Sequence, residues 1–203
     1  MLAFPVAPIR RVPYRRLLML VATAASSSEA RWQQSRFTIL FWVDPLVAPA
    51  KFDARYAEIA AANFSVVLGG FGATTPASVA AQLAACEKHD LKAVVSSCGG
   101  GSAGPGACSR LRSPALWGFS TNMDEPPGAL FANLSNWSKA VAAIDPELLR
   151  FVNIRGLEAT IEGAPTYDGY VERFVKELQP DLLCTDFYPI FRSRSYPTFH
   201  NQQ

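Results

Sequence analysis

The sequence predicts an α/β protein whose parallel sheet is built from successive strand–helix units between residues 37 and 192. Short runs rich in β-branched and aromatic residues alternate with longer stretches in which apolar residues recur every three or four positions. The starts of six such runs are 24 to 34 residues apart, which is the length of one β/α unit. Because helices connect successive strands, the strands are expected to be parallel, with right-handed crossovers.

Each unit supplies one predicted strand. The six strands are expected at residues 37–42, 65–68, 92–96, 116–121, 150–154 and 181–186. The connection between the third and fourth strands is unusual, because the glycine-rich stretch 99–106 leaves only residues 109–113 for a helix. We therefore expect one face of the sheet to be thinly covered there.

The helices are predicted from caps and apolar spacing. Asp53 is expected to cap the first helix, and Thr75 followed by Pro76 is typical of the start of the second. The side chains expected to pack on the sheet are Phe52, Tyr56, Ile59, Val79, Leu83, Cys86, Phe131, Leu134, Trp137, Val141, Tyr167, Val171, Phe174 and Leu178. A doubly wound open sheet and a TIM barrel both fit this pattern.

Residues 1–28 are predicted to be a targeting segment. Four arginines and no acid precede the apolar run 17–25 and three serines, the order of a secretory signal, with an organellar transit peptide as the alternative. Nine apolar residues are too few for a membrane span, which needs about 20. The rest of the chain carries 15 basic and 17 acidic residues, so its charge does not indicate a nucleic-acid partner.

The four cysteines do not have the spacing of a metal site, and we expect neither a metal nor a cofactor. Cys98 and Cys108 flank the glycine-rich stretch, where either a disulfide or two free thiols is consistent with the sequence. Cys86 and Cys184 fall at apolar positions and are expected in the core.

Polar and aromatic residues follow the predicted strands at their carboxyl ends, where parallel β/α folds build their active sites. They include the glycine-rich turn 69–72. The side chains that we select from this edge are Trp42, Asp44, Asp124, Glu125, Asn153, Asp186 and Tyr188. The opposite edge has no comparable set, so this asymmetry indicates a site.

The sequence Asp124-Glu125-Pro126-Pro127 has two interpretations. A carboxyl group at a strand end can have its pKa raised by burial and then protonate a departing glycosidic oxygen. Alternatively, two acids followed by proline simply open a helix, where the helix dipole favours negative charge. The tetrapeptide alone does not separate a catalytic acid from a helix start.

Several motifs in order resemble the clan A group of TIM-barrel glycoside hydrolases, closest to β-galactosidase-like and related sugar hydrolases. They are residues 64–72 (FSVVLGGFG), 116–126 (LWGFSTNMDEP) with Phe131 and Leu134, 151–154 (FVNI) and 186–189 (DFYP). The resemblance covers residues 37–192 and is moderately specific. It implies an incomplete barrel, with about six of eight β/α units in this domain, followed by the tail 193–203.

The resemblance also implies a retaining mechanism in which a glutamate at the end of strand four is the general acid/base, and Glu125 matches that position. The family usually has asparagine before this glutamate, whereas this chain has Asp124. The implied substrate is a carbohydrate, contacted by Asp124, Asp44, Asn153, Asp186, Trp42 and Tyr188. The family's nucleophile is a glutamate at the end of strand seven, and no position here matches it, so we expect a truncated form whose activity is lost or incomplete.

Two other functions remain open at this point. A non-catalytic carbohydrate-binding protein would keep the polar edge without the nucleophile. A nucleotide-binding α/β protein would use the turn 69–72, although its spacing is not that of a dinucleotide-binding fingerprint. The open sheet edge of an incomplete barrel is expected to permit self-association.

Overall fold

The computed structural model describes residues 31–99, 104–121, 123–156 and 166–186. The predicted leader 1–28, the tail 193–203 and Tyr188 lie outside these ranges. Within them, five parallel strands form one sheet in the order of the chain. They are β1 (Leu40–Phe41), β2 (Val66–Leu68), β3 (Lys92–Ser96), β4 (Leu116–Ser120) and β5 (Leu149–Phe151).

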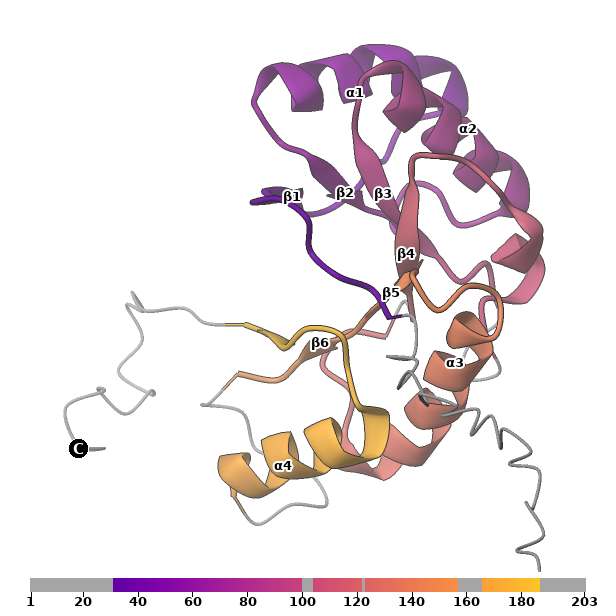
Figure 1. Ribbon diagram of the computed structural model, residues 1–203. Helices are drawn as coiled ribbons and strands as arrows, with labels where there is room; N and C mark the ends of the chain where they lie inside the picture. The colour runs from indigo at the N-terminus through magenta and orange to yellow at the C-terminus, as the bar shows by residue number, and fades with distance from the viewer. Residues whose placement is uncertain (1–30, 100–103, 122, 157–165, 187–203) are drawn as a thin grey trace, which may run out of the picture.

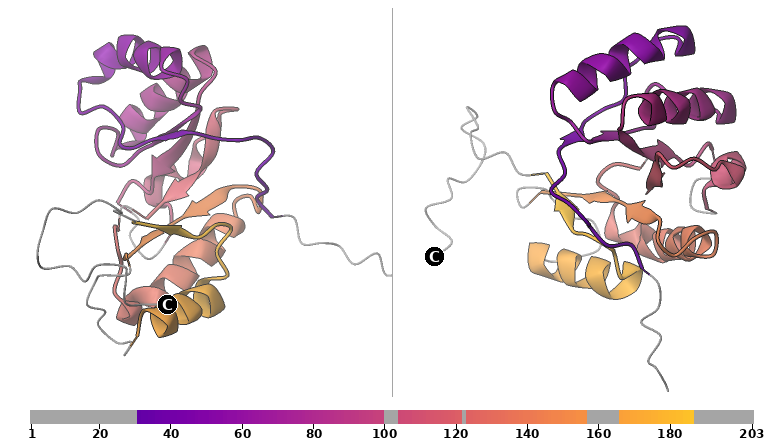
Figure 2. Two further views of the ribbon diagram at one scale, coloured as in Figure 1. Left: turned by 90° about the vertical axis from the view of Figure 1, so that its left-hand side faces the viewer. Right: turned by 45° about the horizontal axis from the view of Figure 1, so that its top comes forward.

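The predicted strand at 150–154 is interrupted. After β5, Val152 intervenes before β6 (Asn153–Ile154), which pairs in parallel with β7 (Cys184–Thr185) as a second, two-stranded sheet. Figure 2 shows β6 and β7 lying beside the helices of the C-terminal half. The described residues therefore confirm an α/β fold with parallel strands.

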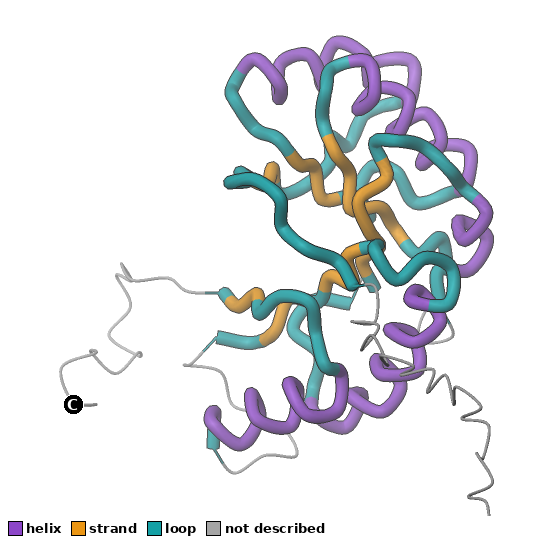
Figure 3. The backbone as a smooth tube through the Cα atoms, in the orientation of Figure 1, coloured by secondary structure: helices purple, strands orange, loops and turns teal. Residues whose placement is uncertain are grey.

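The helices form a layer on one side of the strands. These are α1 (Phe52–Ala61), α2 (Pro76–Lys88), α3 (Phe131–Ala142) and α4 (Tyr167–Leu178), with short 3-10 helices η1 (Pro49–Lys51), η3 (Gly106–Arg110) and η4 (Gly128–Leu130). In Figures 1 and 3 the helices follow the outer arc and the strands lie inside it. Strand order does not reverse within the described five-stranded sheet, whereas a doubly wound sheet has such a reversal. None of the helices in the described ranges is long and apolar enough to cross a membrane.

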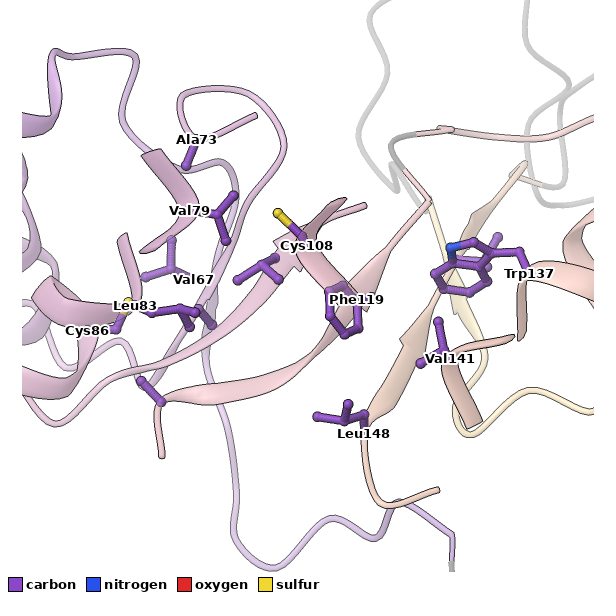
Figure 4. Packing of buried hydrophobic residues seen from close by; sticks show 14 of the residues in the cluster. Val67, Ala73, Val79, Leu83, Cys86, Cys108, Phe119, Trp137, Val141 and Leu148 are labelled. Carbon is purple, nitrogen blue, oxygen red and sulfur yellow. The ribbon is translucent and has the colours of Figure 1, made fainter. Parts of the chain in front are cut away.

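Alternation along the strands divides the core between the two faces of the sheet. Val67, Val95 and Phe119 point toward the helices and join the larger cluster of buried residues, part of which Figure 4 shows. The neighbouring Val66 and Val94 point to the other face, into a second cluster. The larger cluster includes nearly all the predicted helix residues, so the apolar spacing predicted the packed faces well.

The segment before β1 covers the second face. Trp32 is 8% exposed and packs edge-on against Trp117, with ring centroids 5.1 Å apart. It belongs to the cluster that contains Leu68, Leu149 and Phe151. The face of the sheet that points away from the helices is therefore covered near Trp117 by a chain segment and not by a helix.

Two local predictions about the helices are corrected and one is confirmed. Thr75 caps α2 and accepts a hydrogen bond from the Ser78 amide, as expected. Asp53, by contrast, lies inside α1, whose N-cap is Lys51, and its carboxylate pairs with Lys88 and His89 instead. In α4 the buried residues are Tyr170, Phe174 and Leu178, with Tyr167 and Val171 only half-buried at the margin.

Cys98 and Cys108 form a disulfide with their Cα atoms 5.5 Å apart, which decides between the two alternatives left by the sequence. Cys98 directly follows the loop residues after β3, and Cys108 lies in η3. The short helix η3 occupies the connection that has too few residues for an α-helix. Cys86 and Cys184 are free thiols, buried and half-buried respectively.

The buried carboxylate of Asp181 links the segment before β1, through Arg31, to β5, through Arg150. It accepts hydrogen bonds from Arg150 and from Arg31 Nε at 2.9 Å, and Arg31 also donates to the carbonyl groups of Gln179 and Pro180. Burial acts to raise the pKa of Asp181, but the hydrogen bonds from both arginines outweigh it, so the pKa is lowered.

This lowered pKa predicts an acid-dependent loss of stability. Ionised Asp181 stabilises the fold above its unfolded pKa of about 3.9, and the stabilisation disappears as the pH falls toward the folded value. Asp181→Asn should therefore lower Tm at pH 7 much more than at pH 3, with exposed Asp168→Asn as the control. An equal loss of Tm at both pH values would contradict the charge-based explanation.

Candidate active site

The structure brings four of the predicted residues together at the carboxyl ends of β4, β5 and β7. Asp124 and Glu125 follow β4, Asn153 begins β6, and Asp186 follows β7. Because neighbouring parallel strands end at the same edge, residues far apart in the chain meet here. We call Asp124, Glu125, Asn153 and Asp186 the acidic cluster.

Asn153 lies at the centre of the acidic cluster and is 3% exposed. Its amide nitrogen donates to Asp124 Oδ1 at 2.9 Å and to Asp186 Oδ1 at 3.0 Å. Its main-chain carbonyl accepts a hydrogen bond from the Glu125 amide at 3.1 Å. A single residue thus contacts all three acids.

The backbone at Glu125 is held in the left-handed region, with φ at 46°. This conformation costs a non-glycine residue about 1–2 kcal/mol, so neighbouring contacts must maintain it. Besides the bond to Asn153, Arg155 Nε donates to the Glu125 carbonyl at 3.1 Å, and the Tyr170 hydroxyl donates to the Pro126 carbonyl at 2.7 Å. These contacts fix the direction in which the chain presents Glu125.

The environment of Glu125 favours its uncharged form. Burial raises the pKa of the half-buried carboxyl group, and the negative charges of Asp186 and Asp124 raise it further. A side-chain hydrogen bond with Asp186 acts in the same direction, while the charge of Arg155 opposes it. The net direction is upward, which is what a general acid near neutral pH requires.

Asp186 is a direct neighbour of Glu125. The negative charge of Asp186 and its side-chain interaction with Glu125 both act to raise the pKa of the Glu125 carboxyl group. This position suits a group that tunes the charge of Glu125.

A small pocket of about 120 Å³ opens beside the acidic cluster. Its walls include the side chains of Trp42, Phe71, Phe151, Ser120, Asp124 and Asn153. Trp42 is 47% exposed, and its ring lies 6.1 Å from that of Phe71 and 6.4 Å from that of Phe151. The predicted aromatic residue Trp42 therefore lines the same pocket as Asp124, as a stacking surface would.

Asp44 does not face this pocket as a free group. It is 1% exposed, and its carboxylate accepts hydrogen bonds from the amides of Phe71, Gly72 and Ala73 at 2.6 to 2.9 Å. We infer that Asp44 holds in place the turn that contains Phe71. A Cβ at Gly72 would overlap the Pro45 carbonyl, so the turn depends on glycine at that position.

The same contacts bear on nucleotide binding. A glycine-rich turn holds phosphate through main-chain amides that point to a common centre. Here three consecutive amides of residues 71–73 already bind the carboxylate of Asp44. The anion site of this turn is thus filled by the protein's own side chain.

A larger hollow, of about 560 Å³, lies between α3 and α4 near the amino end of β5. It is lined by Arg31, Lys139, Arg150 and Glu177 among others. The two arginines bind Asp181 or main-chain carbonyls, and Glu177 pairs with Arg173. We therefore do not place the site there, despite its size.

Two residues that position Glu125, Arg155 and Tyr170, are absent from the sequence-based selection. Arg155 comes two residues after Asn153, so strand alternation would have placed it on the same side of the chain. Tyr170 belongs to the apolar face of α4 and offers no such signal, because its hydroxyl reaches the site from the helix layer.

Within the ranges that the structure describes, no three His, Cys, Asp or Glu side chains converge in a way that could hold a metal ion. Comparison of the chain with protein-family models and with curated proteins finds no match to either.

Proposed function

We propose that this chain is a glycoside-hydrolase-like protein that acts on O-glycosidic bonds, with Glu125 as its general acid/base. The observation that carries the proposal is the Glu125 carboxyl group, whose pKa is raised by burial and by the charges of Asp186 and Asp124, in a cluster of which Asp124 and Asn153 line an aromatic-walled pocket. A carboxylic acid whose pKa is raised stays protonated to a higher pH than a free carboxyl group, and it can deliver its proton to a departing sugar oxygen.

The arrangement of strands supports the barrel-like part of the proposal. Sequential strand order with helices on one side is the arrangement of a (β/α)₈ barrel. In such barrels the catalytic residues come from the ends of several strands at the carboxyl edge, as the acidic cluster does. We propose that the described units form part of such a barrel.

The substrate we propose is an oligosaccharide or polysaccharide. Trp42 and Phe71 offer the apolar faces on which a sugar ring stacks, while Asp124 offers a hydrogen-bond acceptor on the same wall. Asp124 is exposed, so a sugar hydroxyl can reach it from solvent. Asp186 serves as the charged partner of Glu125.

A second candidate is a carbohydrate-binding protein without turnover. The contacts of Asp186 favour it, because this carboxylate accepts a hydrogen bond from the Asn153 amide at 3.0 Å and acts on the pKa of Glu125, which suits a group that tunes charge better than a nucleophile. In this candidate the pocket, the stacking residues and the acidic cluster bind a sugar without cleaving it.

One experiment separates the two candidates. The purified chain is incubated with a panel of oligosaccharides, and both calorimetric binding and release of new reducing ends are measured. Trp42→Ala should weaken binding of the sugars that bind, whereas Phe37→Ala, another exposed aromatic, should not. Turnover supports the hydrolase, binding alone supports the second candidate, and neither binding nor turnover contradicts both.

A further inference from the structure

Every polar atom of the Asn153 side chain is engaged within the protein. An asparagine amide has two N–H donors and one carbonyl acceptor. The nitrogen donates to Asp124 and to Asp186, and the Oδ1 atom accepts a hydrogen bond from the thiol of Cys184 at 3.3 Å. Asn153 is therefore a poor candidate for contact with a sugar, contrary to the role expected from the sequence.

The Cys184 thiol fixes which way the amide points. Burial, together with the charges of Asp186 and Asp124, raises the pKa of this thiol to about 11. The thiol thus stays protonated near neutral pH and donates to Oδ1, so the nitrogen side of the amide is turned toward the two carboxylates. The same strand pair, β6 and β7, holds both residues in register.

We propose that Asn153 is a positioning residue that holds Asp124, Glu125 and Asp186 together as one unit. Its side chain bridges the two aspartates, and its main-chain carbonyl anchors the amide of Glu125. The role of Asn153 in positioning catalytic groups rests on the function proposed above. The hydrogen bonds from its amide to Asp124 and Asp186 belong to the fold, so they are tested without any substrate.

An asparagine suits this place for reasons of charge and shape. A neutral double donor holds two carboxylates near a third acid without adding charge, and hydrogen bonds to ionised acceptors are about twice as strong as neutral ones. Aspartate has almost the same shape but adds a fourth carboxylate. Among the described residues, Arg155 also acts on the cluster through its charge, which opposes the acids at Glu125, and the Tyr170 hydroxyl binds the Pro126 carbonyl.

The test compares Asn153→Asp and Asn153→Ala with the unchanged protein by thermal unfolding of the full chain at pH 7 and pH 3. We expect Asn153→Asp to lower Tm by about 4–8 °C at pH 7 and by much less at pH 3, where the new carboxyl is mostly protonated. Exposed Asn136→Asp on α3 makes the same chemical change away from the cluster and should shift Tm little at either pH.

A second background links the effect to the proposed contacts. In a protein carrying Asp124→Asn and Asp186→Asn, Asn153→Asp should lose most of its pH 7 penalty, because the new carboxylate then faces amide donors. An equal penalty in both backgrounds, or a loss of Tm that does not depend on pH, would overturn the proposal and leave Asn153 as ordinary packing. Failure to hydrolyse or bind any sugar would contradict only the proposed function, since none of these measurements uses a ligand.

Discussion

Replacing Glu125 by glutamine is expected to lower glycosidic turnover by about 10²–10⁴-fold, the usual contribution of a general acid, while leaving oligosaccharide binding within a few-fold. Glutamine keeps the shape of the side chain but cannot donate a proton to the departing oxygen. The backbone contacts to Asn153 and Arg155 do not involve the replaced atoms, so the fold should persist.

The control for this prediction is Glu58→Gln, which removes an exposed carboxylate paired with Arg55 on α1. It should leave turnover unchanged. Unaltered turnover in Glu125→Gln would remove Glu125 from the mechanism. A parallel loss of binding and of Tm would show that the substitution had disturbed the fold instead of the chemistry.

Replacing Asp44 by alanine is expected to lower the free energy of unfolding by about 3–5 kcal/mol, the largest change in stability that we predict. The substitution leaves the amides of residues 71–73 without their acceptor beneath the turn. The turn also carries Phe71, so the pocket wall should loosen, and any bound oligosaccharide should bind more weakly.

Denaturant unfolding measures this effect, with Asp168→Ala as the matched control. Asp168 is an exposed acid in the first turn of α4, where its loss should cost less than about 1 kcal/mol. If both substitutions cost the same, Asp44 does not anchor the turn and its carboxylate is free for another role.

The acidic cluster could be predicted from the sequence mainly because of a rule about the topology of parallel sheets. Once the strands are recognised as parallel, the residues after their carboxyl ends must meet at one edge, whatever the details of packing. Asp124, Glu125, Asn153 and Asp186 come together for this reason. The rule predicts the backbone position of each residue but not the orientation of its side chain.

Asp44 and Asn153 illustrate what the rule leaves undetermined. Both lie at the correct edge, but the Asp44 carboxylate turns inward to the amides of its neighbouring turn, and the Asn153 amide is shared between two acids. Their hydrogen-bond partners come from other β/α units, so the sequence pattern around each residue does not predict them. The same holds for Asp53, whose contacts with Lys88 and His89 on α2 differ from the cap expected at that position.

The titration of the Glu125 carboxyl group tests the central claim most directly. Carbon-13 NMR of the full chain labelled at glutamate side chains, assigned with Glu125→Gln, would follow this group from pH 2 to pH 9. We expect a pKa above the ordinary glutamate value of about 4.3, and we expect it to move down in Asp186→Asn because one neighbouring negative charge is removed. An ordinary value that Asp186→Asn does not change would contradict the assignment of Glu125 as an acid whose pKa is raised by its site.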